Sequence, residues 1–315
     1  DLDYYDTNSL SGGSITDLVG NSGVLTLPSP GSSGSLGANK AIVVTDLWQQ
    51  HAYIKASNNY ISAEDSYTAN YFGSAVAIDA NGTTIAVSSP RDTSSTTAII
   101  NGSTAANAET FYDRGNGSHH GGVYIYKYGW ETAANWSQQA YIKPASVNDF
   151  EFGYSIDLYG DTLVVGSPYE ASNQDTITNG TTASSDTSNS NSGAVWVFRR
   201  NDSGVWSQEA YIKASNSEAN DQFGYSVAVF QDIIVVGAPG ESSNEITITN
   251  GSSSSTNNSS DGSGAVYVYK RTNGNWSQQA YIKNSYTSWQ IAHSRFGASV
   301  DLNASMLVVG APGDN

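Results

Sequence analysis

The feature that most constrains this chain is a sequence unit that recurs roughly every 70 residues. The clearest copy, WSQEAYIKASNSEANDQFGYSVAVFQDIIVVGAPGE, runs from Trp206 to Glu241. A fixed period of this length is typical of chains built from stacked or radially arranged supersecondary units. The period therefore limits the possible architectures to a small set.

Three anchors mark each copy: a tryptophan, a Phe-Gly pair and a closing proline. The distance from the phenylalanine to the proline is the same in the last three copies and two residues longer in the first. The anchors are Trp48, Trp136, Trp206 and Trp276, the pairs Phe72-Gly73, Phe152-Gly153, Phe223-Gly224 and Phe296-Gly297, and the prolines Pro90, Pro168, Pro239 and Pro312.

Each copy contains four short runs with strand character and no helical periodicity. After Phe223, bulky residues alternate with small ones, as in a strand with one bulky and one small face. The apolar run from Ile233 to Val236 predicts a strand buried on both faces. A β-branched and aromatic run and an amphipathic run after the tryptophan complete the set. We predict an all-β fold, a β-propeller of four-stranded antiparallel blades; an unrelated all-β solenoid or a stack of sandwiches is the alternative.

The combination of FG and GAP at this spacing, followed by GAVYVY and W-x-Q-x-A, resembles the FG-GAP repeat family. The chain is closer to the form found in bacterial surface proteins and more distantly similar to the propeller of integrin α-subunits. The resemblance implies that FG lies on the innermost strand of a blade, GAP on the second, GxVY on the third and the tryptophan on the outer strand.

We expect one propeller domain over residues 1–315, with about four blades and a partial fifth. Residues 11–55 form a degenerate blade in which Ser11 replaces the phenylalanine. Residues 56–143, 144–213 and 214–283 are regular blades. Residues 284–315 supply only half a blade, which leaves an open sheet edge. Two interpretations follow: the polypeptide continues past Asn315 toward the family's usual seven blades, which we favour, or the N-terminal strand fills the gap in a smaller ring.

Long connections between the second and third strands, at residues 91–121, 169–192 and 240–263, consist almost wholly of small polar residues. Each contains an Asn-Gly motif after β-forming residues, which predicts a small hairpin, here called an ear, followed by a mobile polar stretch. The family layout implies that the ears share one rim with the loops that lead into FG, and that rim binds ligands in integrin α-subunits. Solvated spacers are the alternative. Asn101, Asn179 and Asn250 lie in sequons of the ears and would carry glycans in a glycosylating export pathway.

Acidic residues recur at two places in the unit. The DxDxDG-type calcium loop that integrin propellers carry between FG and GAP is not present here. Carboxylates two residues after each proline and shortly before Phe-Gly are expected to cap turns. Calcium that bridges two such loops is the alternative, with Asp65, Asp149, Asp221, Glu170 and Glu241 as candidate ligands. No other cofactor is expected.

The composition limits the function. A formal charge of −16 opposes nucleic-acid binding, and no apolar run approaches the ~20 residues of a membrane span. The chain starts at Asp1 without a methionine, which fits a processed, exported product and equally a mere boundary of the sequence. It has no cysteine, so no disulfide framework and no zinc–cysteine site is expected. We expect a secreted or cell-surface binding or adhesion module with a protein or glycan ligand, able to self-associate into an extracellular assembly. A glycan-binding lectin ranks second and a hydrolase third; because no catalytic motif appears, we expect no enzyme.

Overall fold

The computed structural model describes residues 51–58, 70–94, 96–104, 120–129, 135–146, 151–285 and 293–314. The chain divides into two compact units, Asp1–Tyr53 and Ile54–Asn315, and the architecture below is that of the second. Outside the described residues lie the part of the degenerate blade up to residue 50, which includes Trp48, and the two acids Asp65 and Asp149.

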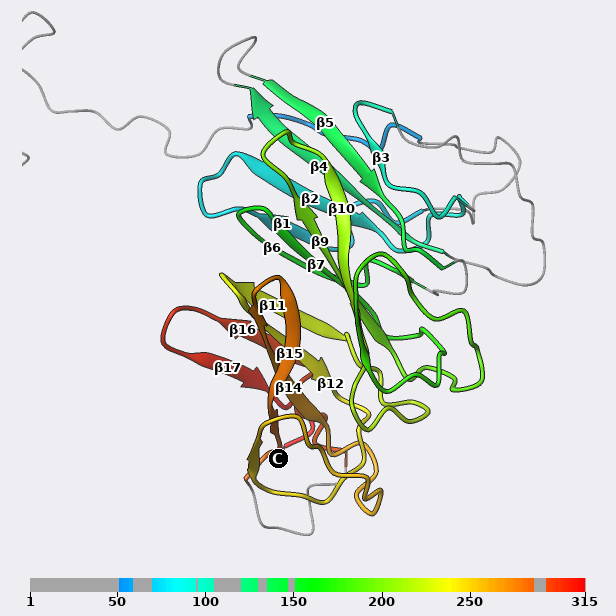
Figure 1. Ribbon diagram of the computed structural model, residues 1–315, viewed down its shortest axis with the longest axis vertical. Helices are drawn as coiled ribbons and strands as arrows, with labels where there is room; N and C mark the ends of the chain where they lie inside the picture. Colours follow the sequence, from blue (N-terminus) through cyan, green and yellow to red (C-terminus); the bar gives the residue numbers. More distant parts are fainter. Residues whose placement is uncertain are drawn as a thin grey trace, which may run out of the picture. The chain divides into compact units, whose positions relative to one another are not determined.

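The described elements are all β-strands, which form three five-stranded antiparallel sheets and one two-stranded sheet (Figure 1). Blade 1 has the spatial order β1 (Val76–Ile78), β2 (Thr84–Ser89), β4 (Gly122–Gly129), β5 (Asn135–Ile142) and β3 (Ile100–Asn101). Blade 2 has the order β6 (Ser155–Tyr159), β7 (Thr162–Ser167), β9 (Ala194–Arg200), β10 (Trp206–Ile212) and β8 (Ile177–Asn179). Blade 3 has the order β11 (Ser226–Phe230), β12 (Ile233–Ala238), β14 (Ala265–Thr272), β15 (Asn275–Ile282) and β13 (Ile248–Asn250). The half-blade consists of β16 (Ser299–Leu302) and β17 (Leu307–Gly310).

The strands have the burial that their sequence patterns predict. The central strand β12 is buried along nearly its whole length, between β11 and β14. In the outer strand β10, Trp206, Gln208 and Ala210 are buried while Ser207 is exposed, which is the predicted period of two. The all-β prediction is therefore confirmed, and the sheets are blades of a β-propeller.

The Phe-Gly pair lies at the junction between two blades. Phe223 precedes β11, is fully buried, and packs with Val195 and Val197 of blade 2. Its backbone forms a parallel bridge with Gly193, and the pairs Gly121–Phe152 and Gly264–Phe296 repeat this bridge. A Cβ at position 193 would lie 2.1 Å from the carbonyl oxygen of Phe223, and the φ of Gly193 is +83°, so only glycine fits there. The repeat thus encodes how each blade meets the preceding one.

The ears differ from the predicted hairpins. Each Asn-Gly motif ends a two- or three-residue strand that pairs with the outer strand of its own blade, so that a blade has five strands where four were predicted. In blade 2, for example, Ile177 lies opposite Ile212 and Asn179 opposite Ala210. The β-branched residues of the motif favour a strand, and the outer strand offers unpaired backbone groups along its edge. Edge pairing therefore replaces the local hairpin.

Successive blades contact one another through their innermost strands, in the order β1, β6, β11 and β16. This is the neighbour relationship that a propeller requires. Within the described part of the chain, there is no helix of the length and apolarity needed to cross a bilayer.

Candidate functional site

A buried cluster of acid, lysine and tyrosine recurs in each complete blade. In blade 2, the Glu170 carboxylate lies 2.6 Å from Lys213 Nζ and accepts a hydrogen bond of 3.0 Å from the Tyr211 hydroxyl. Lys213 also donates to Ser192 Oγ at 2.8 Å. All four residues are at most 2 % exposed. An ion pair with this degree of burial needs such additional hydrogen bonds to satisfy its charges.

Blades 1 and 3 repeat the acid–lysine cluster. Glu241 pairs with Lys283 and accepts from the Tyr281 hydroxyl at 2.8 Å, and Asp92 lies 3.4 Å from Lys143 Nζ. Burial lowers the pKa of both Lys143 and Lys283, and the adjacent carboxylate opposes this shift. The two lysines belong to the Ala-Tyr-Ile-Lys run of the repeat, so the cluster joins the outer strand of a blade to the turn after its second strand.

An asparagine from the preceding segment extends two of these clusters across the blade junction. Asn216, which follows β10, donates to the Glu241 carboxylate at 3.1 Å and accepts from the Tyr267 hydroxyl at 2.6 Å. Asn58 donates to Asp92 in the same way, at 3.1 Å. The acid therefore joins two strands of one blade to the end of the segment before it.

Turn capping by these carboxylates is observed. Glu170 accepts from the backbone N–H of Ser172 at 2.9 Å, and Asp92 accepts from that of Ser94 at 2.9 Å. Before Phe-Gly, Asp221 accepts from the backbone N–H of Glu218 at 2.8 Å. Burial, reinforced by the Glu241 and Glu218 carboxylates, raises the pKa of Asp221 to about 8.

The described acids do not gather into a calcium site. In the described ranges, no three His, Cys, Asp or Glu side chains are placed to hold a metal ion. Lysine, tyrosine and backbone donors occupy the Glu170 carboxylate, and lysine, tyrosine and asparagine donors occupy that of Glu241. Few oxygen lone pairs are left for a cation. Calcium binding stays a prediction, with Asp65 and Asp149 outside the described residues.

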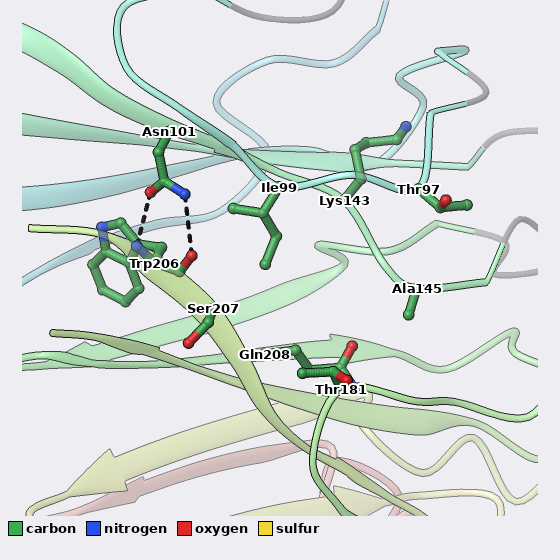
Figure 2. A pocket seen from close by; sticks show the side chains of 9 residues that line it. All are labelled: Thr97, Ile99, Asn101, Lys143, Ala145, Thr181, Trp206, Ser207 and Gln208. Carbon is green, nitrogen blue, oxygen red and sulfur yellow. Dashed lines mark hydrogen bonds between the residues drawn. The ribbon is translucent and has the colours of Figure 1, made fainter.

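A cavity of about 210 Å³ lies where the ear of blade 1 meets the outer strand of blade 2 (Figure 2). Ile99, Lys143, Gln208 and Trp206 are among its lining residues. At one end, Asn101 Oδ1 accepts from the Trp206 backbone N–H at 2.7 Å and Asn101 Nδ2 donates to the Trp206 carbonyl at 3.2 Å. The Asn101 side-chain amide thus makes two hydrogen bonds to the backbone of a single residue, Trp206, of the next blade.

The next junction repeats this asparagine clamp. Asn179 makes the same two bonds to the Trp276 backbone, at 2.7 and 3.3 Å. The indole N–H groups are bonded as well: Trp206 donates to Gln139 and Trp276 to Glu209, at 3.1 and 2.9 Å. Glycosylation of the three ear sequons stays a prediction. A sugar attached to Nδ2 of Asn101 or Asn179 would lie against the strand whose backbone carbonyl accepts the hydrogen bond from that nitrogen.

A row of aromatic and charged side chains runs along one edge of the blades, where FG begins and GAP ends. We call it the inner-rim row; it comprises Tyr71, Arg91, Glu151, Tyr154, Tyr169, Tyr225 and Arg295. Tyr154 lies 5.0 Å from Tyr225 and 5.8 Å from Tyr169, between ring centroids, and the Arg295 guanidinium lies 5.7 Å from the Tyr225 ring. Arg91 pairs with Glu151 at 3.4 Å and covers the Tyr71 ring at 4.7 Å. The row therefore crosses all three blade junctions.

Backbone conformation contributes to the row. Tyr71, Glu151 and Arg295 each precede a Phe-Gly pair and have φ values of 54°, 60° and 56°. Gln222, which precedes the remaining pair and lies outside the row, has a φ of 57°. Residues with side chains adopt this left-handed region at a cost of order 1 kcal/mol, and here it belongs to the turn that all four copies share. The three tyrosines Tyr154, Tyr169 and Tyr225 are only half-buried, unlike those on the third and fourth strands.

Sequence reasoning missed the lysine partner of the acids, the asparagine clamp and the inner-rim row. The first two had a signal in the sequence, because three residues recur at matching positions of successive copies: the lysine of Ala-Tyr-Ile-Lys, the acid after Gly-Ala-Pro and the asparagine of the ear. The row had a weaker signal: tyrosine follows Phe-Gly in two copies, as Tyr154 and Tyr225, but the other positions of the row carry different residue types from one copy to the next.

Two segments of the chain, residues 136–198 and 206–269, match the family model described as FG-GAP repeat. They cover most of blade 2 and blade 3 together with the outer strand that precedes each. A search of the curated proteins finds no match.

Proposed function

Because this chain carries FG-GAP repeats folded into β-propeller blades, we propose that it is a binding module at the cell surface or outside the cell. Its ligand is a protein or a glycan, and the inner-rim row is the contact surface. A set of exposed and half-buried aromatic and charged side chains along one edge of the blades supports binding.

The observation that carries this proposal is the inner-rim row itself. Half-buried Tyr154, Tyr169 and Tyr225 contribute aromatic surface, and Arg91 and Arg295 add cations beside it. Tyrosine and arginine are the residue types most enriched at energetically important positions of protein interfaces. The row lies on loops and strand ends of a rigid scaffold, where recognition commonly resides.

The ears have a smaller part in this proposal than the sequence suggested. Asn101 and Asn179 use their side chains to join neighbouring blades, so an ear that is deleted would disturb a blade junction as well as a loop. Loss of binding after such a deletion would not identify a contact surface. Point substitutions in the row avoid this difficulty.

The test is a double substitution, Tyr154→Ala with Tyr225→Ala, assayed by pull-down on intact cells and on a glycan array. We expect at least a tenfold loss of binding with an unchanged far-ultraviolet circular dichroism spectrum. The matched control, Tyr154→Phe with Tyr225→Phe, keeps the rings and should retain most of the binding. Wild-type binding by the alanine variant would refute the row as the contact surface.

A glycan ligand is the second candidate, favoured by the three tyrosine rings that lie together. Tyr154 has a perpendicular ring contact with Tyr169 and a tilted one with Tyr225, which gathers three half-buried rings at one place, and the apolar face of a sugar can stack on the face of one such ring. Competition by soluble sugar in the pull-down would identify this class, and resistance to every sugar tested would leave a protein ligand.

A further inference from the structure

Blade 3 places a lysine and an asparagine on the two oxygens of one buried carboxylate. Lys283 Nζ donates to Glu241 Oε2, and Asn216 Nδ2 donates to Glu241 Oε1 at 3.1 Å. The three residues are at most 8 % exposed. The amine of the lysine and the carboxamide of the asparagine are therefore neighbours at a site that is closed to bulk water.

The Asn216 amide is held at both of its ends. The Tyr267 hydroxyl donates to Asn216 Oδ1 at 2.6 Å, and Asn216 Nδ2 also donates to the Ser255 carbonyl, at 2.6 Å. Burial and the nearby carboxylates of Glu241 and Asp221 raise the pKa of Tyr267, so its hydroxyl keeps its proton and remains a donor. A donor fixed at this oxygen stabilises the negative charge that forms there when a nucleophile adds to the amide carbon.

Blade 1 repeats this arrangement with an aspartate as the acid. Asn58 Nδ2 donates to Asp92 Oδ2 at 3.1 Å, and Lys143 Nζ lies 3.4 Å from Asp92 Oδ1. The Tyr124 hydroxyl donates to Asn58 Oδ1, which is the contact that Tyr267 makes in blade 3. Blades 1 and 3 thus share the same four groups: lysine, asparagine, acid and tyrosine.

Blade 2 keeps the acid and the lysine but lacks the other two groups. Ser146 stands where the other blades have the asparagine, three residues after the lysine of the preceding Ala-Tyr-Ile-Lys run. Trp196 on β9 stands where they have the tyrosine, because it pairs with β7 at the register in which Tyr267 pairs with β12. An asparagine and a tyrosine that served only to support the ion pair would be needed in blade 2 as well. The two residues therefore have a role of their own.

We propose that Lys283 and Asn216 react to form an intramolecular amide bond, with the loss of ammonia. Lys143 and Asn58 form a second such bond in blade 1. Blade 2 forms none, because Ser146 has no carboxamide carbon for the lysine to attack.

The reaction is an acyl transfer that needs no outside reagent. A proton passes from Lys283 to Glu241 and leaves a neutral amine, a step that burial favours because it lowers the pKa of the lysine. The neutral Nζ attacks Cγ of Asn216, and the negative charge of the tetrahedral intermediate forms on Oδ1. Glu241 gives its proton to Nδ2, the bond from Cγ to Nδ2 breaks, and ammonia leaves. Glu241 then takes the extra proton from Nζ, so that the amide, the ammonia and the carboxylic acid balance the starting ion pair and carboxamide.

Each bond closes a covalent loop around one blade. Asn216 lies before β11 and Lys283 directly follows β15, so the loop contains all five strands of blade 3. Asn58 and Lys143 enclose β1 to β5 in the same way. A crosslink that spans so long a loop reduces the conformational entropy of the unfolded chain. In a chain without cysteine, these amides would take the part that disulfides play in other proteins.

The test is the mass of the denatured whole chain, followed by tryptic peptide mapping. We expect a mass about 34 Da below the one calculated from the sequence, which corresponds to two molecules of ammonia. Trypsin does not cleave after a lysine whose amine is acylated. Residues 214–270 and 272–295 should therefore appear as one branched peptide, in which the chain is not cut after Lys283.

Three variants address the role of each group. Glu241→Gln keeps the lysine and the asparagine but removes the proton carrier, so the branched peptide of blade 3 should decrease at least tenfold. The matched control, Glu170→Gln, makes the same change in blade 2 and should leave both branched peptides at wild-type amounts. Ser146→Asn with Trp196→Tyr supplies blade 2 with the missing groups. A third bond, between position 146 and Lys213, should then lower the mass by a further amount of about 17 Da.

A wild-type chain that has its calculated mass and is cut after Lys283 would overturn the proposal. A lighter chain without branched peptides would overturn it too, since an asparagine before glycine also loses ammonia when it cyclises. Complete crosslinking of blade 3 in a folded Glu241→Gln variant would refute the proton transfer through Glu241. A third branched peptide in blade 2 supports the proposal whether or not Glu241→Gln folds, because it requires a bond to form where the wild type has none.

Discussion

Asn179 and Trp276 are joined across a blade junction by a matched pair of hydrogen bonds. The backbone N–H of Trp276 donates to Asn179 Oδ1 at 2.7 Å, and Asn179 Nδ2 donates to the Trp276 carbonyl at 3.3 Å. An amide side chain offers a donor and an acceptor side by side, which is the arrangement a single backbone residue requires. The ear thus stabilises the following blade as well as its own.

The first prediction concerns this pair. Asn179→Ala removes both bonds and leaves two backbone groups of Trp276 unpaired, so the free energy of unfolding should fall by about 1–3 kcal/mol. Asn244→Ala makes the same chemical change at an exposed site and should alter it by less than about 0.5 kcal/mol. Chemical denaturation of both variants checks this. Equal stability of the two would mean that the clamp contributes nothing.

The second prediction concerns the ion pair of blade 2. Lys213→Met leaves the Glu170 carboxylate 2 % exposed and without its cation, so we expect a loss of about 3–5 kcal/mol. Glu170→Gln added to Lys213→Met removes the uncompensated charge and should recover at least half of that loss. Denaturant titrations of the wild type, both single variants and the double variant give the coupling energy. Additive losses would contradict a direct charge interaction.

The sequence was sufficient to predict the blades because their signals are local and repeated. The alternation after Phe223 and the apolar run from Ile233 gave strands with the burial later observed. The fifth strand could not be inferred in this way. Ile177 to Asn179 is too short to show a period, and what makes it a strand is the free edge of β10, which is a property of the assembled sheet.

The candidate sites were less predictable, because they depend on contacts between residues far apart in the chain. Glu170 was correctly expected to cap a turn, but its lysine lies 43 residues away and only the fold brings the two together. The inner-rim row combines side chains from three blades and the half-blade. Tyr154 and Tyr225 both follow a Phe-Gly pair, but Arg295 precedes one, so the contacts among them could not be read from the repeat. The sequence repeat therefore predicts the strands of the blades, but it does not predict which side chains meet on their surface.

The third prediction compares two phenylalanines of the repeat. Phe223 is fully buried and has edge contacts with Tyr267 and Tyr269 at ring-centroid distances of 5.3 and 6.1 Å. Phe223→Ala should therefore cost about 3–5 kcal/mol. Phe296 leads into the half-blade and is only half-buried, so Phe296→Ala should cost clearly less. Thermal and urea unfolding of both variants measures the difference; a larger loss at Phe296 would contradict the assignment of the core.

The last prediction concerns Asp221, whose pKa is raised to about 8 by burial and by two neighbouring carboxylates. In the unfolded chain this group ionises near pH 4, so between about pH 4 and pH 8 folding takes up a proton. The contribution of Asp221 to stability is complete below pH 4 and is lost as the pH rises toward 8, at no more than about 1.4 kcal/mol per pH unit.

Asp221→Asn keeps an oxygen for the Glu218 N–H and cannot ionise, so it should match the wild type at pH 4 and exceed it in stability at pH 8. Asp202→Asn, at an exposed carboxylate, should show no such divergence. Urea unfolding of the three proteins at pH 4, 6 and 8 gives the slopes, and parallel slopes for wild type and Asp221→Asn would mean that Asp221 is ionised in the folded protein.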